Sequence, residues 1–155
     1  MKKSLYILLL FFWIIPSGFA QLKTHTFEEA EKLSKENPKP LVVFIHTSWC
    51  KYCTMMENST FKNPEIINVL NSDFYFIPLD AETKNDIQFN NHKFQFIPNG
   101  NNTGIHELAT ALATINSQVV YPTVTVLQTD YSIVFQQQSF LSGKELTAIL
   151  TKAKK

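Results

Sequence analysis

The chain of 155 residues contains no arginine and has little glycine. All 14 basic residues are lysines, and they face 13 acidic residues, so the formal net charge is only +1. Without arginine the chain lacks the guanidinium forks that read phosphate and guanine, and it has no basic excess. Its four glycines leave no glycine-rich phosphate loop. We therefore expect no nucleic-acid partner, and the 45% hydrophobic content excludes a disordered chain.

The first 20 residues have the pattern of a secretory signal peptide. Two lysines precede an unbroken apolar run at residues 5–15, and Gly18 and Ala20 are small residues at positions −3 and −1 of a cleavage site. The alternative is a retained membrane anchor, but such a helix needs about 20 apolar residues. We expect cleavage before Gln21 and export to the periplasm, or to the extracellular space. No stable membrane insertion is expected once the leader is removed.

The chain has only two cysteines, Cys50 and Cys53, and two residues separate them. A disulfide across so short a loop removes little entropy from the unfolded chain, so it would stabilise the fold only slightly. An exported protein occupies a compartment in which disulfides persist. The spacing therefore favours a redox centre over a structural staple.

The hydrophobic pattern of the remaining chain predicts alternating helices and strands. Capping boxes begin at Thr26 and Ser142, and apolar runs rich in β-branched residues indicate buried strands. Strands are predicted at 41–45, 74–79, 123–127 and 131–135, and helices at 26–37, from 50, at 64–70, at 105–113 and from 142. One strand–helix–strand crossover followed by a closing β-β-α unit implies a mixed sheet covered on both faces.

The stretch at residues 83–104 is less regular. Residues 87–89 and 94–96 alternate apolar and polar side chains around an Asn-Asn pair, which tolerates positive φ. We predict a small β-hairpin here, followed by a polar loop at 99–104.

These features resemble the thioredoxin-like superfamily over residues 26–152. The resemblance rests on the Trp-Cys-x-x-Cys motif at a strand-to-helix junction, on Pro122 after a variable stretch, and on the closing β-β-α unit. The sequence is similar in particular to the branch that contains the periplasmic C-terminal domain of the transmembrane disulfide-reductant conductor. The motifs shared with that branch are Met55-Met56-Glu57, Thr60-Phe61 and Pro64-Glu65.

The resemblance implies an α/β, three-layer thioredoxin-like fold over residues 21–155, with a mixed central sheet and helices on both faces. The small β-hairpin would be an insertion, about residues 83–104, with no counterpart in minimal thioredoxin. Two roles are open for the insertion: a surface decoration, or an element that docks partners beside the active site, since long irregular insertions are often functional.

The cysteine pair suits thiol–disulfide exchange, which needs an exposed thiolate and a second thiol that resolves the mixed disulfide. Cys50 lies where a helix is predicted to begin, so free N–H groups and the helix dipole favour its thiolate. Lys51 adds a nearby cation. We therefore expect Cys50 to be the nucleophile and Cys53, one turn further along, to be the resolving cysteine.

The resemblance also implies a substrate-binding surface. Trp49 would form a lip of this surface; the alternative is an aromatic ring that simply packs beside the turn. Pro122 would follow a cis peptide bond and leave the backbone of Tyr121 free to pair with an extended substrate peptide.

Three further residues are expected to tune the redox centre. The resemblance assigns this role to Lys51 and Tyr52, which lie between the cysteines; the alternative is that both are ordinary exposed positions. His46 lies four residues before Cys50, and an imidazolium near the sulfur would favour the thiolate.

The sequence departs from thioredoxin at Phe44, where thioredoxin carries a buried aspartate that helps to move a proton from the resolving thiol. Glu57 could take over this function, although a solvated helix charge is the simpler explanation because glutamate is rarely buried. A metal site would need Cys50, Cys53 and His46 with a fourth ligand. The histidines left for that fourth position are His25, His92 and His106, and none has a supporting spacing.

The sequence thus predicts an exported thiol:disulfide oxidoreductase that needs neither a metal nor an organic cofactor. The resemblance favours a reductant. Its partners would be cysteine-containing exported proteins and a redox partner that regenerates the cysteine pair. The alternative is a non-enzymatic thioredoxin-like module that holds peptides or carries a metal.

Overall fold

The computed structural model describes residues 21–154, so the predicted signal peptide at residues 1–20 lies outside the described residues. The helices are α2 (Phe27–Glu36), α3 (Lys51–Asn58), α4 (Pro64–Asp73), α5 (Glu107–Ala113) and α6 (Gly143–Ala153), and a short 3-10 helix, η2 (Thr60–Lys62), joins α3 to α4. The central strands are β1 (Leu41–His46), β2 (Tyr75–Asp80), β9 (Thr123–Leu127) and β10 (Ile133–Gln137). Within the described residues no helix is long and apolar enough to cross a membrane.

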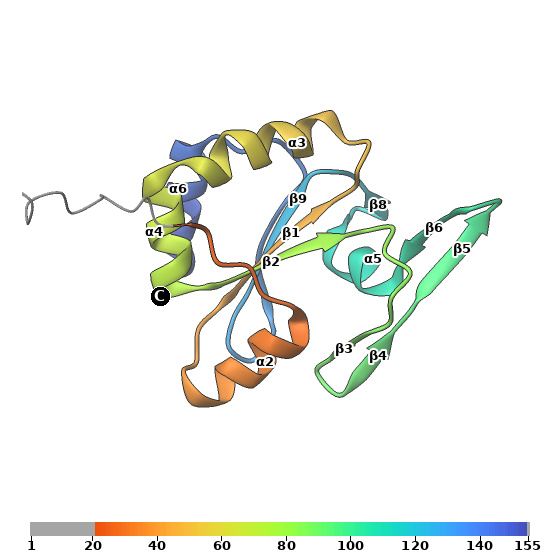
Figure 1. The fold of residues 1–155 in the computed structure, drawn as a ribbon, viewed down its shortest axis with the longest axis horizontal. Helices are drawn as coiled ribbons and strands as arrows, with labels where there is room; N and C mark the ends of the chain where they lie inside the picture. The colour runs from red at the N-terminus through yellow and green to blue at the C-terminus, as the bar shows by residue number, and fades with distance from the viewer. Residues whose placement is uncertain (1–20, 155) are drawn as a thin grey trace, which may run out of the picture.

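The central sheet is mixed, as predicted. Its strand order is β10-β9-β1-β2, with β1 and β2 parallel and the other neighbours antiparallel. Helices α3, α4 and α6 pack on one face, and α2 and α5 pack on the other (Figure 1). The prediction of a three-layer α/β fold is therefore confirmed.

Strand β1 shows why the central strands form continuous apolar runs. Val42 and Phe44 pack into the core under α3, α4 and α6, whereas Leu41, Val43 and Ile45 pack into the core under α2 and α5. Both faces of the strand are buried, so no position favours a polar side chain until His46. This strand carries the chain to the edge of the sheet at which the two cysteines follow.

The segment between β2 and α5 differs from the prediction, because it forms two hairpins instead of one hairpin and a loop. The first joins β3 (Ile87–Phe89) to β4 (His92–Phe94) through Asn90 and Asn91, whose φ angles are 51° and 58°. Its second strand begins two residues earlier than predicted. The second hairpin joins β5 (Phe96–Gly100) to β6 (Thr103–His106) and occupies most of the predicted polar loop. It extends away from the central sheet (Figure 1).

Smaller differences also have local causes. A short hairpin of β7 (Thr114–Ile115) and β8 (Gln118–Val119) precedes β9, and its two-residue strands are too short to leave a periodic pattern. Strand β10 begins two residues later than predicted because Tyr131 lies in the turn with a φ of 66°. Helix α5 begins at Glu107 because His106 is its N-cap.

The hairpins β3–β4 and β5–β6 together form a double hairpin. His106 links both of its ends, and the ring of His106 is fully buried. Its Nδ1 accepts the N–H of Leu108 at 3.3 Å, so the ring proton lies on Nε2, which donates to the carbonyl of Asn85 at 3.2 Å. The backbone N–H of His106 donates to Ala81 O at 2.8 Å, and Ala81 N–H donates to His46 O at 2.8 Å. The segment therefore leaves and rejoins the domain beside the end of β1.

Candidate functional site

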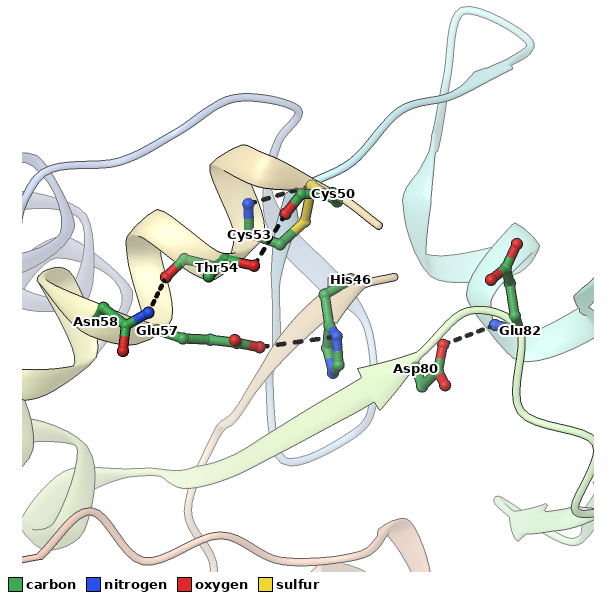
Figure 2. Close-up of polar contacts among 8 residues, drawn as sticks. All are labelled: His46, Cys50, Cys53, Thr54, Glu57, Asn58, Asp80 and Glu82. Carbon is green, nitrogen blue, oxygen red and sulfur yellow. Dashed lines mark hydrogen bonds and ion pairs between the residues drawn. A yellow bond between two sulfur atoms is a disulfide. The ribbon is translucent and has the colours of Figure 1, made fainter. Parts of the chain in front are cut away.

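The turn between β1 and α3 carries the cysteine pair. The N–H of Cys50 donates to Thr47 O at 3.2 Å, which closes the turn, and Cys50 is the N-cap residue of α3. Its Sγ accepts the backbone N–H of Cys53 at 3.1 Å and is bonded to the Sγ of Cys53 at 2.09 Å (Figure 2). A sulfur at this position meets a free helical N–H group and the positive end of the helix dipole, both of which stabilise a thiolate.

Both cysteines are buried in the disulfide form, Cys50 slightly less than Cys53. The residue Cys50 is 6% exposed, whereas Cys53 is 1% exposed. In the disulfide form neither sulfur is widely open, so the site is more enclosed than the sequence alone suggests. An attacking group meets Cys50 first, because Cys53 lies one turn inside α3 against the core.

Trp49 and Tyr121 meet beside the disulfide. Trp49 is 65% exposed, and its ring approaches that of Tyr121 edge-on, with 6.1 Å between centroids. The indole Nε1–H donates to Glu82 Oε1 at 3.1 Å. Trp49 therefore bridges the cysteine turn and the loop that precedes β9, although much of its ring faces solvent.

The loop before β9 contains the predicted cis peptide bond, between Tyr121 and Pro122. Thr123, the next residue, pairs with Ile45 at the end of the β1–β9 ladder. Tyr121 lies outside that ladder, so its backbone does not take part in the central sheet. Burial, helped by the carboxylates of Glu82 and Asp80, raises the pKa of Tyr121 to about 12.

His46 points toward Glu57 (Figure 2). Its Nδ1 lies 3.8 Å from Glu57 Oε1, and its ring stacks on Phe44 with 5.2 Å between centroids. The side chain of Glu57 is 46% exposed, so Glu57 is neither a buried acid nor a fully solvated charge. Phe44 itself is buried, so the position that the resemblance matches to the thioredoxin aspartate holds an aromatic ring.

Lys51 and Tyr52 occupy the first turn of α3, and both are exposed. Neither side chain packs into the core, so both face solvent beside the cysteine pair. Among residues 21–154, Lys51 forms no ion pair.

The histidines that a metal site would need are held apart by the fold. His25 packs edge-on against Tyr75, and His92 against Phe94, while His106 caps α5. In the part of the chain that the structure describes, no three histidine, cysteine or acidic residues are grouped so that they could hold a metal ion. Cys50 and Cys53 are bonded to each other instead.

Glu82 is a site residue that the sequence analysis missed. It lies two residues after β2, and its N–H donates to Asp80 Oδ1 at 3.0 Å. A signal for it exists, because the carboxyl ends of neighbouring parallel strands meet at one edge of a sheet. Residues that follow β2 should therefore lie near those that follow β1, which include Trp49.

Comparison with known proteins agrees with this geometry. The family model of the thioredoxin-like domain matches residues 27–154. The DsbH oxidoreductase superposes with a TM-score of 0.62 over 90% of this chain and 88% of its own, at 17% identity. A thioredoxin from Thermus thermophilus superposes with a TM-score of 0.60 over 85% of this chain and 86% of its own, also at 17% identity. The oxidised C-terminal domain of DsbD from Neisseria meningitidis superposes with a TM-score of 0.53 over 80% of this chain and 89% of its own, at 20% identity. These structures share the fold of this chain.

Sequence similarity to curated proteins is more local. Spermatogenesis-associated protein 20 of Homo sapiens is 38% identical over 60 residues, which make up 39% of this chain and 8% of that protein. The rat protein matches over the same length at the same identity. The chain thus spans only a small part of the length of these relatives.

Proposed function

The chain belongs to the thioredoxin-like domain family, and we propose that it is an exported thiol:disulfide oxidoreductase that reduces disulfides in other exported proteins. The observation that carries this proposal is the Cys50–Cys53 disulfide at the N-terminus of α3, where Cys50 Sγ accepts a backbone N–H. This environment favours the thiolate that exchange chemistry needs.

The reduction begins from the dithiol form. The thiolate of Cys50 attacks one sulfur of a client disulfide, forms a mixed disulfide with it and releases the other client sulfur as a thiolate. The thiolate of Cys53 then attacks Cys50 Sγ, which restores the Cys50–Cys53 bond and releases the second client thiolate. Two electrons have passed to the client, and a dithiol redox partner must return two electrons to the pair.

The residues around the disulfide supply docking and tuning. We assign docking to Trp49, Tyr121 and Pro122, because the first two meet beside the disulfide and the backbone of Tyr121 is outside the sheet. An extended client strand can pair with that backbone, which gives affinity with little dependence on sequence. We assign the tuning of the reduction potential of the cysteine pair to Lys51, Tyr52 and His46, as the sequence predicted.

Export rests on the signal-like first 20 residues. Expression in a bacterium with a periplasm should yield a secreted product whose N-terminus, read by mass spectrometry, begins at Gln21 or its cyclised form. A product that keeps residues 1–20 in the membrane fraction would contradict export without affecting the exchange chemistry.

Catalysis is tested by the reduction of a model protein disulfide with a thiol donor. The wild type should accelerate the reaction, and a Cys50→Ser/Cys53→Ser variant should not. A reductant requires a potential for the pair nearer to about −270 mV than to about −120 mV, measured in a glutathione or dithiothreitol buffer. Client binding that persists without both sulfurs, with no acceleration by the wild type, would instead identify a peptide-holding protein.

A further inference from the structure

Two carboxylates lie beside the proposed docking edge. Asp80 ends β2 opposite His46 in the β1–β2 register, and its Oδ1 accepts the N–H of Glu82 at 3.0 Å (Figure 2). Glu82 Oε1 in turn accepts the indole N–H of Trp49 at 3.1 Å. The Glu82 carboxylate is thereby held against the residue that precedes Cys50.

The field of these carboxylates reaches the loop before β9. Trp49, which holds Glu82, contacts the ring of Tyr121, with 6.1 Å between centroids. Both Glu82 and Asp80 add to the effect of burial in raising the pKa of the Tyr121 phenol to about 12. A client strand paired with the backbone of Tyr121 would therefore enter a region of negative potential.

Within residues 21–154, no ion pair neutralises either carboxylate. The ion pairs there join His46 to Glu57, Lys93 to Asp86 and Lys154 to Asp73. Lys84 is close to Glu82 in sequence, but its Nζ lies over the ring of Phe96 at 5.9 Å from the centroid. Lys51 is exposed on the first turn of α3, after Cys50.

We propose that Asp80 and Glu82 select client segments that carry a lysine or arginine beside the reacting cysteine. This inference rests on the proposed oxidoreductase function and adds a substrate class to it. Complementary charges speed the encounter of two proteins and disfavour partners of like charge. Because an extended strand points alternate side chains to the same face, a residue near the client cysteine can face the carboxylates while its backbone pairs with Tyr121.

The test uses three matched peptides, each with one internal disulfide, that carry lysine, glutamine or glutamate beside the same cysteine. For the wild type, kcat/KM should fall in the order lysine, glutamine, glutamate, with about a threefold to tenfold difference between the ends of the series at low salt. The difference should nearly vanish at about 1 M salt, where the screening length is about 3 Å.

Two variants with the same change in net charge locate the effect. Glu82→Gln keeps an oxygen that can accept the Trp49 indole N–H but removes the charge, so the preference for the lysine peptide should shrink by about twofold to threefold. The control is Glu36→Gln. Glu36 is the last residue of α2, which packs on the sheet face opposite α3, so this variant should leave the preference unchanged.

Equal rates for the three peptides with the wild type would overturn the inference, as would an equal loss of preference in Glu82→Gln and Glu36→Gln. Either result leaves the oxidoreductase proposal standing, because the peptides are still reduced. If the wild type reduces none of the peptides, the proposed function is overturned and this inference with it.

Discussion

Replacement of Cys53 by alanine should turn the reduced protein into a covalent trap for its clients. Cys50 keeps its place as the N-cap of α3 and is the less buried of the two cysteines, so it can still attack a client disulfide. The mixed disulfide then persists, because the thiol that resolves it is absent. Clients should appear as adducts on non-reducing gels, disappear with dithiothreitol, and be identifiable by mass spectrometry.

The matched variant is Cys50→Ala, which retains only the buried Cys53. It should form no client adducts, because Cys53 is 1% exposed and packs against the core. Both variants should lose catalytic turnover, so the adducts, and not the rate, separate the two roles. Adducts that accumulate with Cys50→Ala and not with Cys53→Ala would reverse the assignment.

Replacement of Phe44 by alanine should lower the free energy of unfolding by about 3–5 kcal/mol, the usual range for a buried phenylalanine. Phe44 is 1% exposed, and its ring lies 4.8 Å from that of Phe61 and 5.2 Å from that of His46, measured between centroids. Truncation leaves a cavity between β1 and the helices above it. Urea unfolding, followed by circular dichroism, measures the loss.

Two further variants separate packing from polarity at this position. Phe44→Leu keeps most of the apolar volume and should cost the least of the three. Phe44→Asp introduces the side chain that the resemblance expects here, but it removes the packing against Phe61 and buries a carboxyl group, so it should cost at least as much as alanine. If Phe44→Asp is no more destabilising than Phe44→Leu, the site accommodates an acid, and packing does not explain why phenylalanine is present.

The parts of the fold that the sequence predicted are those in which burial fixes the residue pattern. Strand β1 is apolar on both faces because both faces are covered, and the capping boxes at Thr26 and Ser142 form as expected. The place of Cys50 at the start of a helix was predicted in the same way, because a buried strand ends just before it and a helix pattern follows it. Long-range pairing within the sheet then follows from a small number of allowed connections.

The features that escaped prediction depend on contacts that a local pattern does not record. Most of β5 is exposed, and the two buried residues of β6 are Gly104 and His106, so no alternation of apolar residues marks this ribbon. The sequence analysis weighed His106 as a possible metal ligand, whereas in the structure it is a buried helix cap whose Nε2–H donates to the carbonyl of Asn85. The contact of Glu82 with Trp49 spans 33 positions in the chain.

The hydrogen bond between Ala81 O and the N–H of His106 brings the two roots of the double hairpin together. Once the ends of a segment are fixed side by side, its length has little influence on stability, since each doubling of a flexible loop costs only about 0.6 kcal/mol. During evolution, insertions or deletions between these roots can therefore accumulate without displacing β2 or α5. The same closure makes this position a natural point for grafting a foreign peptide onto the scaffold near its redox centre.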